Sequence, residues 1–327
     1  MRRSMRVLMQ NRPEELWQGG DMMQLRATME SLGRLGVECE YSGAPVYPSA
    51  IGMRTFDVVH NFNFSMAWNK YQTWVAKKHK KPLVCSMIYH EGAQFVSYAD
   101  QQIMADHTDA MIFLTKGEIE RVKRHLTIDE RKCHVIPNGV HSAWFRPIKV
   151  ASDIAPYVLT VGRIEPSKGQ LEAAEACKRL GVHYVMIGQR TDEDYARACE
   201  AKGAGYFPPM DGNGLIRAYA HCSAFVLASA AEVMPLTVME AMAQGANVVL
   251  TEKCEWETPN VLRCTPGNVD SIESALRVAM IRPKNLSGLR EVQGMTWDNV
   301  ALSLKKIYTS LCDTSSPAEP VSSVHTS

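Results

Sequence analysis

The chain has 327 residues, of which 46% are hydrophobic and 22% are charged, and its net charge is +1. This length predicts two domains, because one domain usually holds about 100–200 residues. No apolar run approaches the roughly 18–20 residues that cross a bilayer, which excludes a membrane-spanning protein. The apolar stretch near the N-terminus is shorter than the roughly 7–15 residues of a signal-peptide core. We therefore expect a cytoplasmic protein, either free or held peripherally at a membrane.

Charge and cysteine usage restrict the partners further. Residues 1–150 hold 20 Lys and Arg against 15 Asp and Glu, whereas the remaining residues hold 16 against 20. Much of the positive charge lies in the runs 77–81 and 121–132. A solvated surface is the simpler interpretation of these runs, and attraction of an anionic partner such as nucleic acid or a phospholipid surface is the alternative. The nine cysteines include no C-x-x-C pair, which fits reduced thiols better than disulfides or a zinc site.

Short apolar runs alternate with stretches of helical length along the chain. In the first half we predict strands at residues 6–10, 56–60, 83–88, 110–114 and 133–136. After a proline-containing stretch at 145–156, strands follow at 157–161, 183–187, 224–227 and 247–250. This alternation is typical of βαβ units and predicts an α/β fold with two doubly wound sheets.

The end of the chain differs from the rest. A last helix is predicted at about 297–311, and the following residues are rich in Ser, Pro and Thr. We expect domains at 1–150 and 151–312, with the last helix packing back on the first domain. Residues 313–327 lack the apolar side chains that a packed segment needs and are expected to form a disordered tail.

A glycine-flanked turn after strand 157–161 is the strongest candidate site. Its sequence is Gly162-Arg163-Ile164-Glu165-Pro166-Ser167-Lys168-Gly169, and a helix follows. The free N–H groups of that helix favour an anion, and Arg163 and Lys168 add two positive charges. The turn therefore predicts a diphosphate site. It matches neither G-x-G-x-x-G nor G-x-x-x-x-G-K-[ST], so spacing alone leaves a purely structural turn as the alternative.

Two glutamates, Glu232 and Glu240, lie in a later apolar segment. On one continuous helix they would be roughly 12 Å apart, so they would serve opposite ends of an extended ligand. Glu240 lies within the apolar run MEAMA, where an unpaired carboxylate is costly. Without further context, a solvated helix face remains the alternative for both.

Taken in order, these motifs resemble the family-4 glycosyltransferases, which are retaining enzymes of the GT-B fold. VGRIEPSKG at 161–169 resembles their Gly-Arg to Lys-Gly element, and residues 225–249 resemble their E-x7-E segment. VIPNGVHSAWFRP at 135–147 resembles the element that ends the N-terminal domain, and CSMIYHEG at 85–92 a strand that ends in a site histidine. Gly19-Gly20-Asp21 resembles the glycine-rich loop near the start. The resemblance covers about residues 5–310.

The resemblance implies a GT-B architecture, in which two Rossmann-like domains face a central cleft. The N-terminal domain would bind the acceptor, and the C-terminal domain a nucleotide-diphosphate sugar. The resemblance implies catalytic roles for His90, Arg163, Lys168 and Glu232. It implies that the donor-binding residues are Gly19, Gly20, Gly162, Arg163, Lys168, Val233, Met234, Pro235, Leu236, Thr237 and Glu240.

Individual roles also follow from the resemblance. Arg163 and Lys168 would hold the donor phosphates, Glu232 the sugar hydroxyls, and Glu240 the ribose. The backbone amides from 233 to 237 would cap the phosphates or the sugar, and Gly19 and Gly20 would close on the phosphates. His90 would reach the donor sugar, although a packed, hydrogen-bonded histidine is the alternative.

Departures from the family pattern limit the assignment. Val233, Met234 and Pro235 replace the commoner Gly-Phe-Gly, and Asn247 replaces a common proline. The donor's base and sugar therefore stay open. The N-terminal domain is short for the family, so the acceptor is open as well, and the sequence predicts no oligomeric state.

The mechanism is predicted partly from what the sequence lacks. We expect no D-x-D pair that presents two carboxylates on a loop, as a metal-bridged diphosphate would require, and therefore expect metal-independent transfer with no cofactor. The resemblance implies front-face substitution of a hexose or related sugar onto a saccharide, a small molecule or a lipid-linked group. The alternatives are transfer to a modified base of DNA, a GT-B nucleotide-sugar epimerase, and an inactive nucleotide-sugar-binding protein. An NAD-dependent enzyme is disfavoured because G-x-G-x-x-G is missing after the first strand.

Overall fold

The computed structural model describes residues 3–12, 19–43, 50–89, 96–148 and 155–315. Contacts divide the chain into two compact units, Met1–Ile136 with Val300–Ser327, and Pro137–Asn299. The division follows Ile136 and so lies before residue 150, because the next segment bonds within the second unit. There the Val140 N–H donates to the Met295 carbonyl at 2.7 Å.

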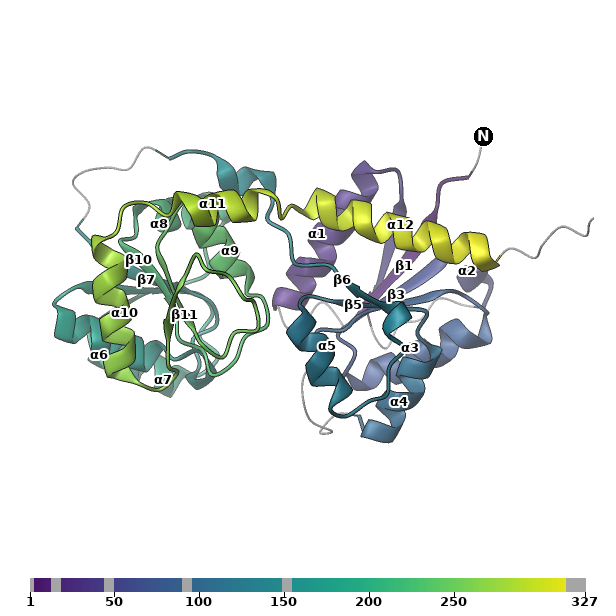
Figure 1. Cartoon of the computed structure of the whole chain (residues 1–327), viewed down its shortest axis with the longest axis horizontal. Helices are drawn as coiled ribbons and strands as arrows, with labels where there is room; N and C mark the ends of the chain where they lie inside the picture. Colours follow the sequence, from purple (N-terminus) through teal and green to yellow (C-terminus); the bar gives the residue numbers. More distant parts are fainter. Residues whose placement is uncertain (1–2, 13–18, 44–49, 90–95, 149–154, 316–327) are drawn as a thin grey trace, which may run out of the picture. The chain divides into compact units, whose positions relative to one another are not determined.

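The first unit is built around a six-stranded parallel sheet in the order β2-β1-β3-β4-β5-β6 (Figure 1). Its strands are β1 (Arg6–Asn11), β2 (Glu38–Gly43), β3 (Val58–Phe62), β4 (Leu83–Ser86), β5 (Ala110–Phe113) and β6 (Cys133–Val135). Its helices are α1 (Gly20–Arg34), α2 (Ala50–Arg54), α3 (Ala67–Lys78), α4 (Tyr98–His107), α5 (Lys116–Lys123) and the 3₁₀ turn η1 (Glu130–Lys132).

The second unit has a six-stranded parallel sheet in the order β12-β11-β10-β7-β8-β9. Its strands are β7 (Tyr157–Val161), β8 (His183–Ile187), β9 (Ala204–Phe207), β10 (Ala224–Leu227), β11 (Val248–Thr251) and β12 (Leu262–Cys264). Its helices are α6 (Gln170–Leu180), α7 (Glu193–Ala201), α8 (Gly212–His221), α9 (Leu236–Ala243), α10 (Val269–Ile281) and α11 (Leu286–Gln293), with the 3₁₀ turns η2 (Ser142–Phe145) and η3 (Pro166–Lys168).

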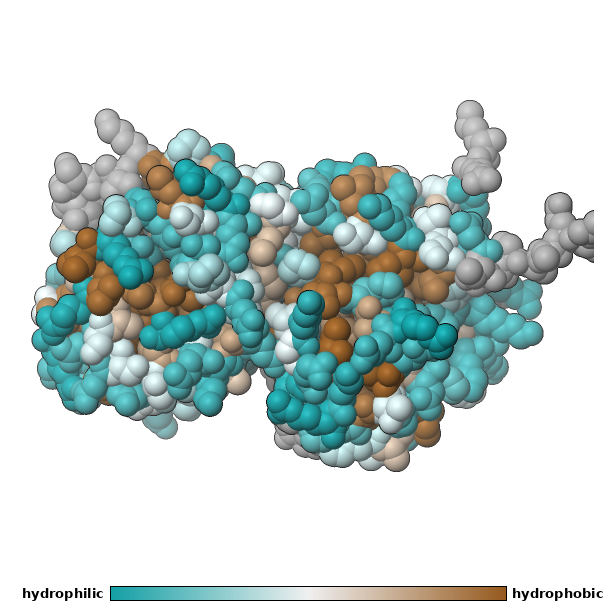
Figure 2. All heavy atoms as spheres, in the orientation of Figure 1, coloured by the Kyte–Doolittle hydropathy of each residue, from teal (hydrophilic) through white to brown (hydrophobic). Residues whose placement is uncertain are grey.

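The core of each unit lies between its sheet and its helices. All residues of β3 and β10 are buried, as expected for strands that helices cover on both faces. In the second unit, Ala173 of α6 and Ala275 of α10 join one cluster with Val158 and Val226 of the sheet. The face drawn in Figure 2 is mostly hydrophilic, with hydrophobic residues interrupting it over both units. The predicted α/β fold with two doubly wound sheets is thus confirmed.

The last helix, α12 (Trp297–Ser315), belongs to the first unit from Val300 onward. Its Lys305 ammonium donates to the Leu35 carbonyl at 2.7 Å. The fully buried Tyr308 hydroxyl lies 2.6 Å from Nδ1 of His60, whose Nε2 lies 3.0 Å from the Ser86 hydroxyl. These contacts complete the first unit with residues from the far end of the chain. No helix among the described residues combines the length and the apolar character that crossing a bilayer requires.

In each sheet, the chain adds strands first on one side of the sheet's first strand and then on its other side. In the first unit, β1 lies between β2 and β3, and in the second, β7 lies between β8 and β10. Doubly wound sheets bind ligands outside the carboxyl ends of the strands at such a switch point. The segments that follow β1, β3, β7 and β10 are therefore the positions where site residues are expected.

Candidate functional site

The turn after β7 packs closely against the segments that follow β8 and β10. A Cβ added at Gly188 would lie 1.9 Å from the Gly162 carbonyl oxygen. Gly169 has φ +70, and a Cβ there would lie 2.4 Å from the Ala228 carbonyl oxygen. The Ala230 N–H donates to the Ser167 carbonyl at 2.8 Å. Glycine is thus required at 169 and 188 to bring the predicted phosphate turn against its neighbours at the switch point.

Lys168 and Glu232 form an ion pair at this edge of the sheet. The Lys168 Nζ donates to Glu232 Oε1 at 2.7 Å, and the two side chains are 21% and 13% exposed. The Glu232 N–H donates to the Lys253 carbonyl, and its own carbonyl accepts from the Glu255 N–H. The segment after β11 therefore holds Glu232 in place. The structure brings together two residues that the sequence predicts as catalytic, and half-burial keeps both partly accessible.

Arg163 is anchored by Glu165, a residue that the sequence pattern did not single out. An Arg163 Nη1 lies 3.0 Å from Glu165 Oε2, and the Arg163 side chain is 51% exposed. Glu165 also accepts hydrogen bonds from the Ser167 and Thr191 hydroxyls. Burial raises the pKa of Glu165, but hydrogen bonds from Ser167 and Thr191 and the charges of Arg163 and Lys168 outweigh it, so the pKa lies below its ordinary value. The sequence signal that could have identified Glu165 is its position between two basic residues, Arg163 and Lys168.

Glu240 has different surroundings, on α9. Its Oε2 accepts a hydrogen bond of 3.1 Å from the Tyr219 hydroxyl of α8. Burial raises the pKa of Glu240 from 4.5 to about 8, although the Tyr219 hydrogen bond acts in the opposite direction. The carboxyl of Glu240 therefore holds its proton to a higher pH than an ordinary glutamate does. It lies on the helix, whereas Glu232 lies in the segment before it, as the predicted division of roles requires.

Among the hydrogen bonds of the described residues, none uses the backbone N–H groups of Leu236 and Thr237 at the start of α9. Pro235 precedes the helix, and no side chain caps it. The first N–H groups that bond within the helix, those of Val238 and Met239, both donate to the Pro235 carbonyl. Of the five predicted positions from 233 to 237, Pro235 has no N–H, so four can donate one. Leu236 and Thr237 lie in the first turn, where helical amides lack intrahelical partners.

The side chain of Asn138 also holds the segment before α9 in place. Its Nδ2 donates to the Met234 carbonyl at 2.9 Å, and the side chain is only 5% exposed. The adjacent Gly139 is equally constrained, since a Cβ there would lie 2.4 Å from the Trp297 nitrogen. The IPNGV segment therefore positions Met234 through one buried amide. The sequence marks this segment by resemblance, but it gives no direct indication of the contact.

Gly19 and Gly20 lie in the first unit, at the switch point beside β1. Gly19 precedes α1, and Gly20 is its first residue. A Cβ at Gly19 would lie 2.6 Å from a guanidinium nitrogen of Arg12. That nitrogen forms an ion pair of 2.5 Å with Asp21, and both side chains are 8% exposed. The glycine therefore makes room for a buried ion pair.

Asparagines complete the Arg12–Asp21 site. Asp21 Oδ2 accepts hydrogen bonds from Nδ2 of Asn11 at 3.2 Å and of Asn63 at 3.3 Å. Asn63 directly follows β3 and has φ +67, a conformation that asparagine tolerates better than most residues. Sequence patterns missed Arg12 and Asn63 as site candidates. The sequence signal that could have identified both is a polar residue directly after each of two strands, β1 and β3, which pair at the switch point.

His90 lies outside the described residues, but the turn that leads toward it is described. Ile88 has φ +40, a strained conformation for a β-branched residue. The next N–H, that of Tyr89, donates to Glu118 Oε1 at 2.8 Å, and the Leu114 N–H donates to Glu118 Oε2 at 2.8 Å. Glu118 is fully buried. Its carboxylate thus joins the ends of β4 and β5.

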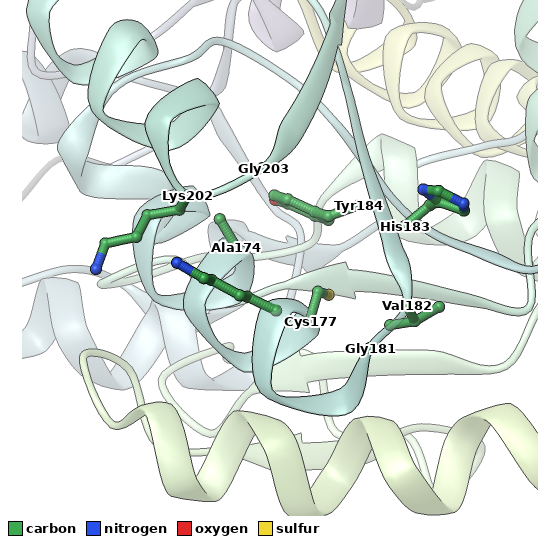
Figure 3. A pocket seen from close by; sticks show the side chains of 9 residues that line it. Ala174, Cys177, Gly181, Val182, His183, Tyr184, Lys202 and Gly203 are labelled. Atoms are coloured by element: carbon green, nitrogen blue, oxygen red, sulfur yellow. The ribbon is translucent and has the colours of Figure 1, made fainter.

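Other features of the described residues do not coincide with this site. A cavity of about 270 Å³ in the second unit is lined by residues of α6 and β8 and by Lys202 and Gly203 (Figure 3). It lies at the amino end of β8, opposite to the edge where doubly wound sheets bind ligands. Within the described ranges, no group of three or more His, Cys, Asp or Glu side chains is arranged to hold a metal ion. Metal independence stays a prediction.

Two protein-family models match the chain in succession. The model described as Glycosyltransferase Family 4 matches residues 40–144, and the model described as Glycosyl transferases group 1 matches residues 145–278. A curated relative from Campylobacter jejuni, N,N'-diacetylbacillosaminyl-diphospho-undecaprenol alpha-1,3-N-acetylgalactosaminyltransferase, is 26% identical over 209 residues. The match covers 59% of this chain and 52% of the relative, so the chain spans about half the length of the curated relative it matches.

Solved structures share the fold. Sucrose-phosphate synthase from Thermosynechococcus elongatus is similar with a TM-score of 0.78 and 16% identity, covering 95% of this chain and 100% of that one. HepE of Anabaena, in complex with UDP and glucose, also has a TM-score of 0.78, with 14% identity over 94% and 100% of the two chains. The apo form of the lipopolysaccharide outer core galactosyltransferase WaaB has a TM-score of 0.66 and 14% identity, over 93% and 99%. At such identities the similarity shows the fold alone.

Proposed function

We propose that this chain, whose two halves match the models described as Glycosyltransferase Family 4 and Glycosyl transferases group 1, is a GT-B glycosyltransferase that moves a sugar from a nucleotide-diphosphate donor to an acceptor hydroxyl. The observation that carries the proposal is the Lys168–Glu232 ion pair at the switch point of the second unit. A cation and a carboxylate 2.7 Å apart suit a ligand that presents a phosphate and a sugar hydroxyl side by side. The HepE structure, which holds UDP and glucose, has the same fold and supports this choice of donor.

Each side chain has a role in the proposal. Lys168 and Arg163 bind the diphosphate, and Glu165 orients Arg163 toward it. Glu232 accepts hydrogen bonds from the sugar hydroxyls, and Glu240 accepts them from the ribose. The N–H groups at the start of α9 bind further oxygen atoms, because the positive end of a helix favours anions. Contacts of His90, Gly19 and Gly20 with the donor stay predictions that follow from the resemblance alone.

We propose a retaining, front-face reaction. The bond between the sugar C1 and the phosphate oxygen breaks, and a bond from C1 to the acceptor oxygen forms on the same face. The acceptor proton passes to the leaving phosphate, and a nucleoside diphosphate is released. Lys168 and Arg163 stabilise the charge that develops on the leaving group, a form of catalysis that needs neither a metal nor a carboxylate nucleophile.

The acceptor is proposed to be a hydroxyl on a saccharide, a small molecule or a lipid-linked group. The name of the curated relative includes a diphospho-undecaprenol acceptor, which favours the lipid-linked class. Transfer in the presence of a chelator tests metal independence, and formation of an altered nucleotide sugar without any acceptor would identify an epimerase instead.

Thermal unfolding with UDP-, GDP-, ADP- and TDP-sugars tests the donor. A ligand at one hundred times its Kd stabilises the folded protein by about 2.7 kcal/mol, so one donor should raise the Tm of the wild-type protein. Lys168→Ala should lose most of this shift and most of the transfer activity, because a charge-assisted phosphate contact is removed. Lys178→Ala changes an exposed lysine of the same unit and is the control. The absence of any shift in the wild-type protein, or full activity of Lys168→Ala, would contradict the proposal.

A further inference from the structure

Helix α3 exposes a face that is both basic and aromatic. Its exposed side chains beyond Ala67 are Lys70, Tyr71, Trp74, Lys77 and Lys78. These positions follow one another at intervals of one or three residues and therefore share one side of the helix. Tyr71 is 46% exposed and Trp74 is 51% exposed. The helix contains no Asp or Glu, so its exposed face carries three positive charges and no negative one.

Helix α4 runs beside α3 and extends this surface (Figure 1). The Lys70 ammonium lies 2.7 Å from Asp100, and the Lys77 ammonium lies 2.6 Å from Nε2 of His107. Both contacts join residues thirty positions apart, so the helices run parallel and in a fixed register. Ile103 lies between these two contacts on α4, just as Trp74 does on α3, and it is 54% exposed.

We call Lys70, Tyr71, Trp74, Lys77 and Lys78 of α3, together with Ile103 of α4, the basic-aromatic face. Within it, the Tyr71 and Trp74 rings are 5.6 Å apart, and the Lys78 Nζ lies 4.8 Å from the centre of the Trp74 ring. At its end is a hollow of about 330 Å³, and half of its lining residues are basic: Lys77, Lys80, Lys81 and His107, with Pro82, Leu83, Asp109 and Leu311 making up the rest. Apolar side chains are thus surrounded by lysines.

We propose that the basic-aromatic face docks the protein on a bilayer of anionic phospholipids. Trp and Tyr favour the boundary between headgroups and hydrocarbon, and Ile favours the hydrocarbon itself. Lysines beside them are attracted to the negative charge of the lipid surface. A helix with these two properties lies in the plane of the membrane.

Nucleic acid would be attracted by the same lysines, but it explains the face less well. Aromatic rings can stack on bases, whereas the aliphatic Ile103, which stands level with Trp74, has no such use. The acidic residues near the face are Asp100, which pairs with Lys70, Asp106, which accepts a hydrogen bond from Gln102, and Asp109, which accepts one from the Leu83 N–H. These acidic residues do not pair with Lys77 or Lys78, so both ammonium groups can bind lipid phosphate. This inference goes beyond the proposed function, since docking needs no sugar donor.

Co-sedimentation of the full chain with vesicles, in the absence of any donor, tests the proposal. Vesicles that contain phosphatidylglycerol should bind the protein at low salt, and vesicles of pure phosphatidylcholine should bind it much less. Lys77→Gln and Lys78→Gln should each weaken binding by about fivefold. Trp74→Ser with Ile103→Ser should weaken it by about tenfold. The matched control, Lys178→Gln with Ile281→Ser, changes exposed residues of the second unit and should bind as wild type does.

Fluorescence quenching by brominated phosphatidylglycerol locates the contact. The wild-type protein should be quenched, and Trp74→Phe, which keeps an aromatic ring and the fold, should lose most of that quenching. Equal binding to neutral and anionic vesicles would overturn the proposal, and so would equal binding by the wild-type protein and the face variants. Retention of duplex DNA by the wild-type protein without vesicle binding would overturn it in favour of nucleic acid.

Discussion

At the scale of single residues, Glu232 and Glu240 differ in the groups that surround each carboxyl. Glu232 is paired with Lys168, whereas Glu240 meets only a tyrosine hydroxyl among the contacts described for its side chain. We predict that Glu232→Gln mainly lowers kcat, because it removes a charge beside the reacting sugar. Glu240→Gln should mainly raise the donor KM, because the ribose contact changes little during the reaction. Initial rates over a range of donor concentrations measure both, and equal effects on both parameters would contradict this division of roles.

The raised pKa of Glu240 leads to a second prediction, which concerns how the stability of the protein depends on pH. Its carboxyl keeps a proton up to about pH 8 in the folded protein, whereas the unfolded chain loses that proton near pH 4.5. The folded state therefore binds more protons between these values, and the unfolding free energy falls as the pH rises through this window. Glu240→Gln should remove this part of the fall. Calorimetric Tm values from pH 5 to pH 8 measure it, with the exposed Glu193→Gln as control; parallel wild-type and Glu240→Gln curves would exclude the effect.

The residues of the candidate site differ in how well the sequence alone identifies them. Lys168, Arg163 and Glu232 are recognisable because the family motif fixes their spacing. The Arg12–Asp21 pair and the Glu165 anchor are not, because each depends on which segments the topology brings together. Asn63, for example, is 42 residues from Asp21 in sequence, and only the β1–β3 pairing places it at 3.3 Å.

At the scale of elements, Glu118 joins two strand ends. Its carboxylate accepts the N–H groups of Tyr89 and Leu114, and the Thr115 hydroxyl accepts from the Glu118 N–H, so one residue organises the start of α5. We predict that Glu118→Ala lowers the unfolding free energy by about 2–4 kcal/mol, because two buried N–H groups lose their partner. Urea unfolding measures the loss. Glu120→Ala, on the exposed side of the same helix, should cost little, and similar losses for both variants would contradict this role.

Elements at the edges of the sheets were the hardest to predict. The sequence pattern identifies the central strands, but of the four edge strands it identifies only β6 and misses β2, β9 and β12. The residues of β2 are all half-buried or exposed, and β9 has one buried residue of four. Edge strands have one neighbour instead of two, so their sequences lack the continuous apolar run that marks a central strand.

At the scale of the whole molecule, the chain passes between the two units twice. It enters the second unit after Ile136 and returns to the first after Asn299. Alternating strands and helices predict two sheets, but they do not predict which unit a terminal helix completes. That depends on long-range contacts such as the one between Tyr308 and His60, 248 residues apart in sequence.

This organisation predicts that the two units respond separately to two perturbations. Tyr308→Ala removes a fully buried ring and the partner of a buried histidine, and such core truncations cost about 3–5 kcal/mol. Backbone amides of β1, β3 and β4 should then exchange hydrogen faster, while those of β7 and β10 change little.

A bound nucleotide sugar should do the converse and slow exchange mainly around β7, β10 and α9, because Lys168, Glu232 and Glu240 lie in the second unit. Hydrogen-exchange mass spectrometry on the wild-type protein and on Tyr308→Ala, each with and without donor, resolves both effects. Uniform acceleration of exchange across all strands in Tyr308→Ala would mean that the two units unfold as one.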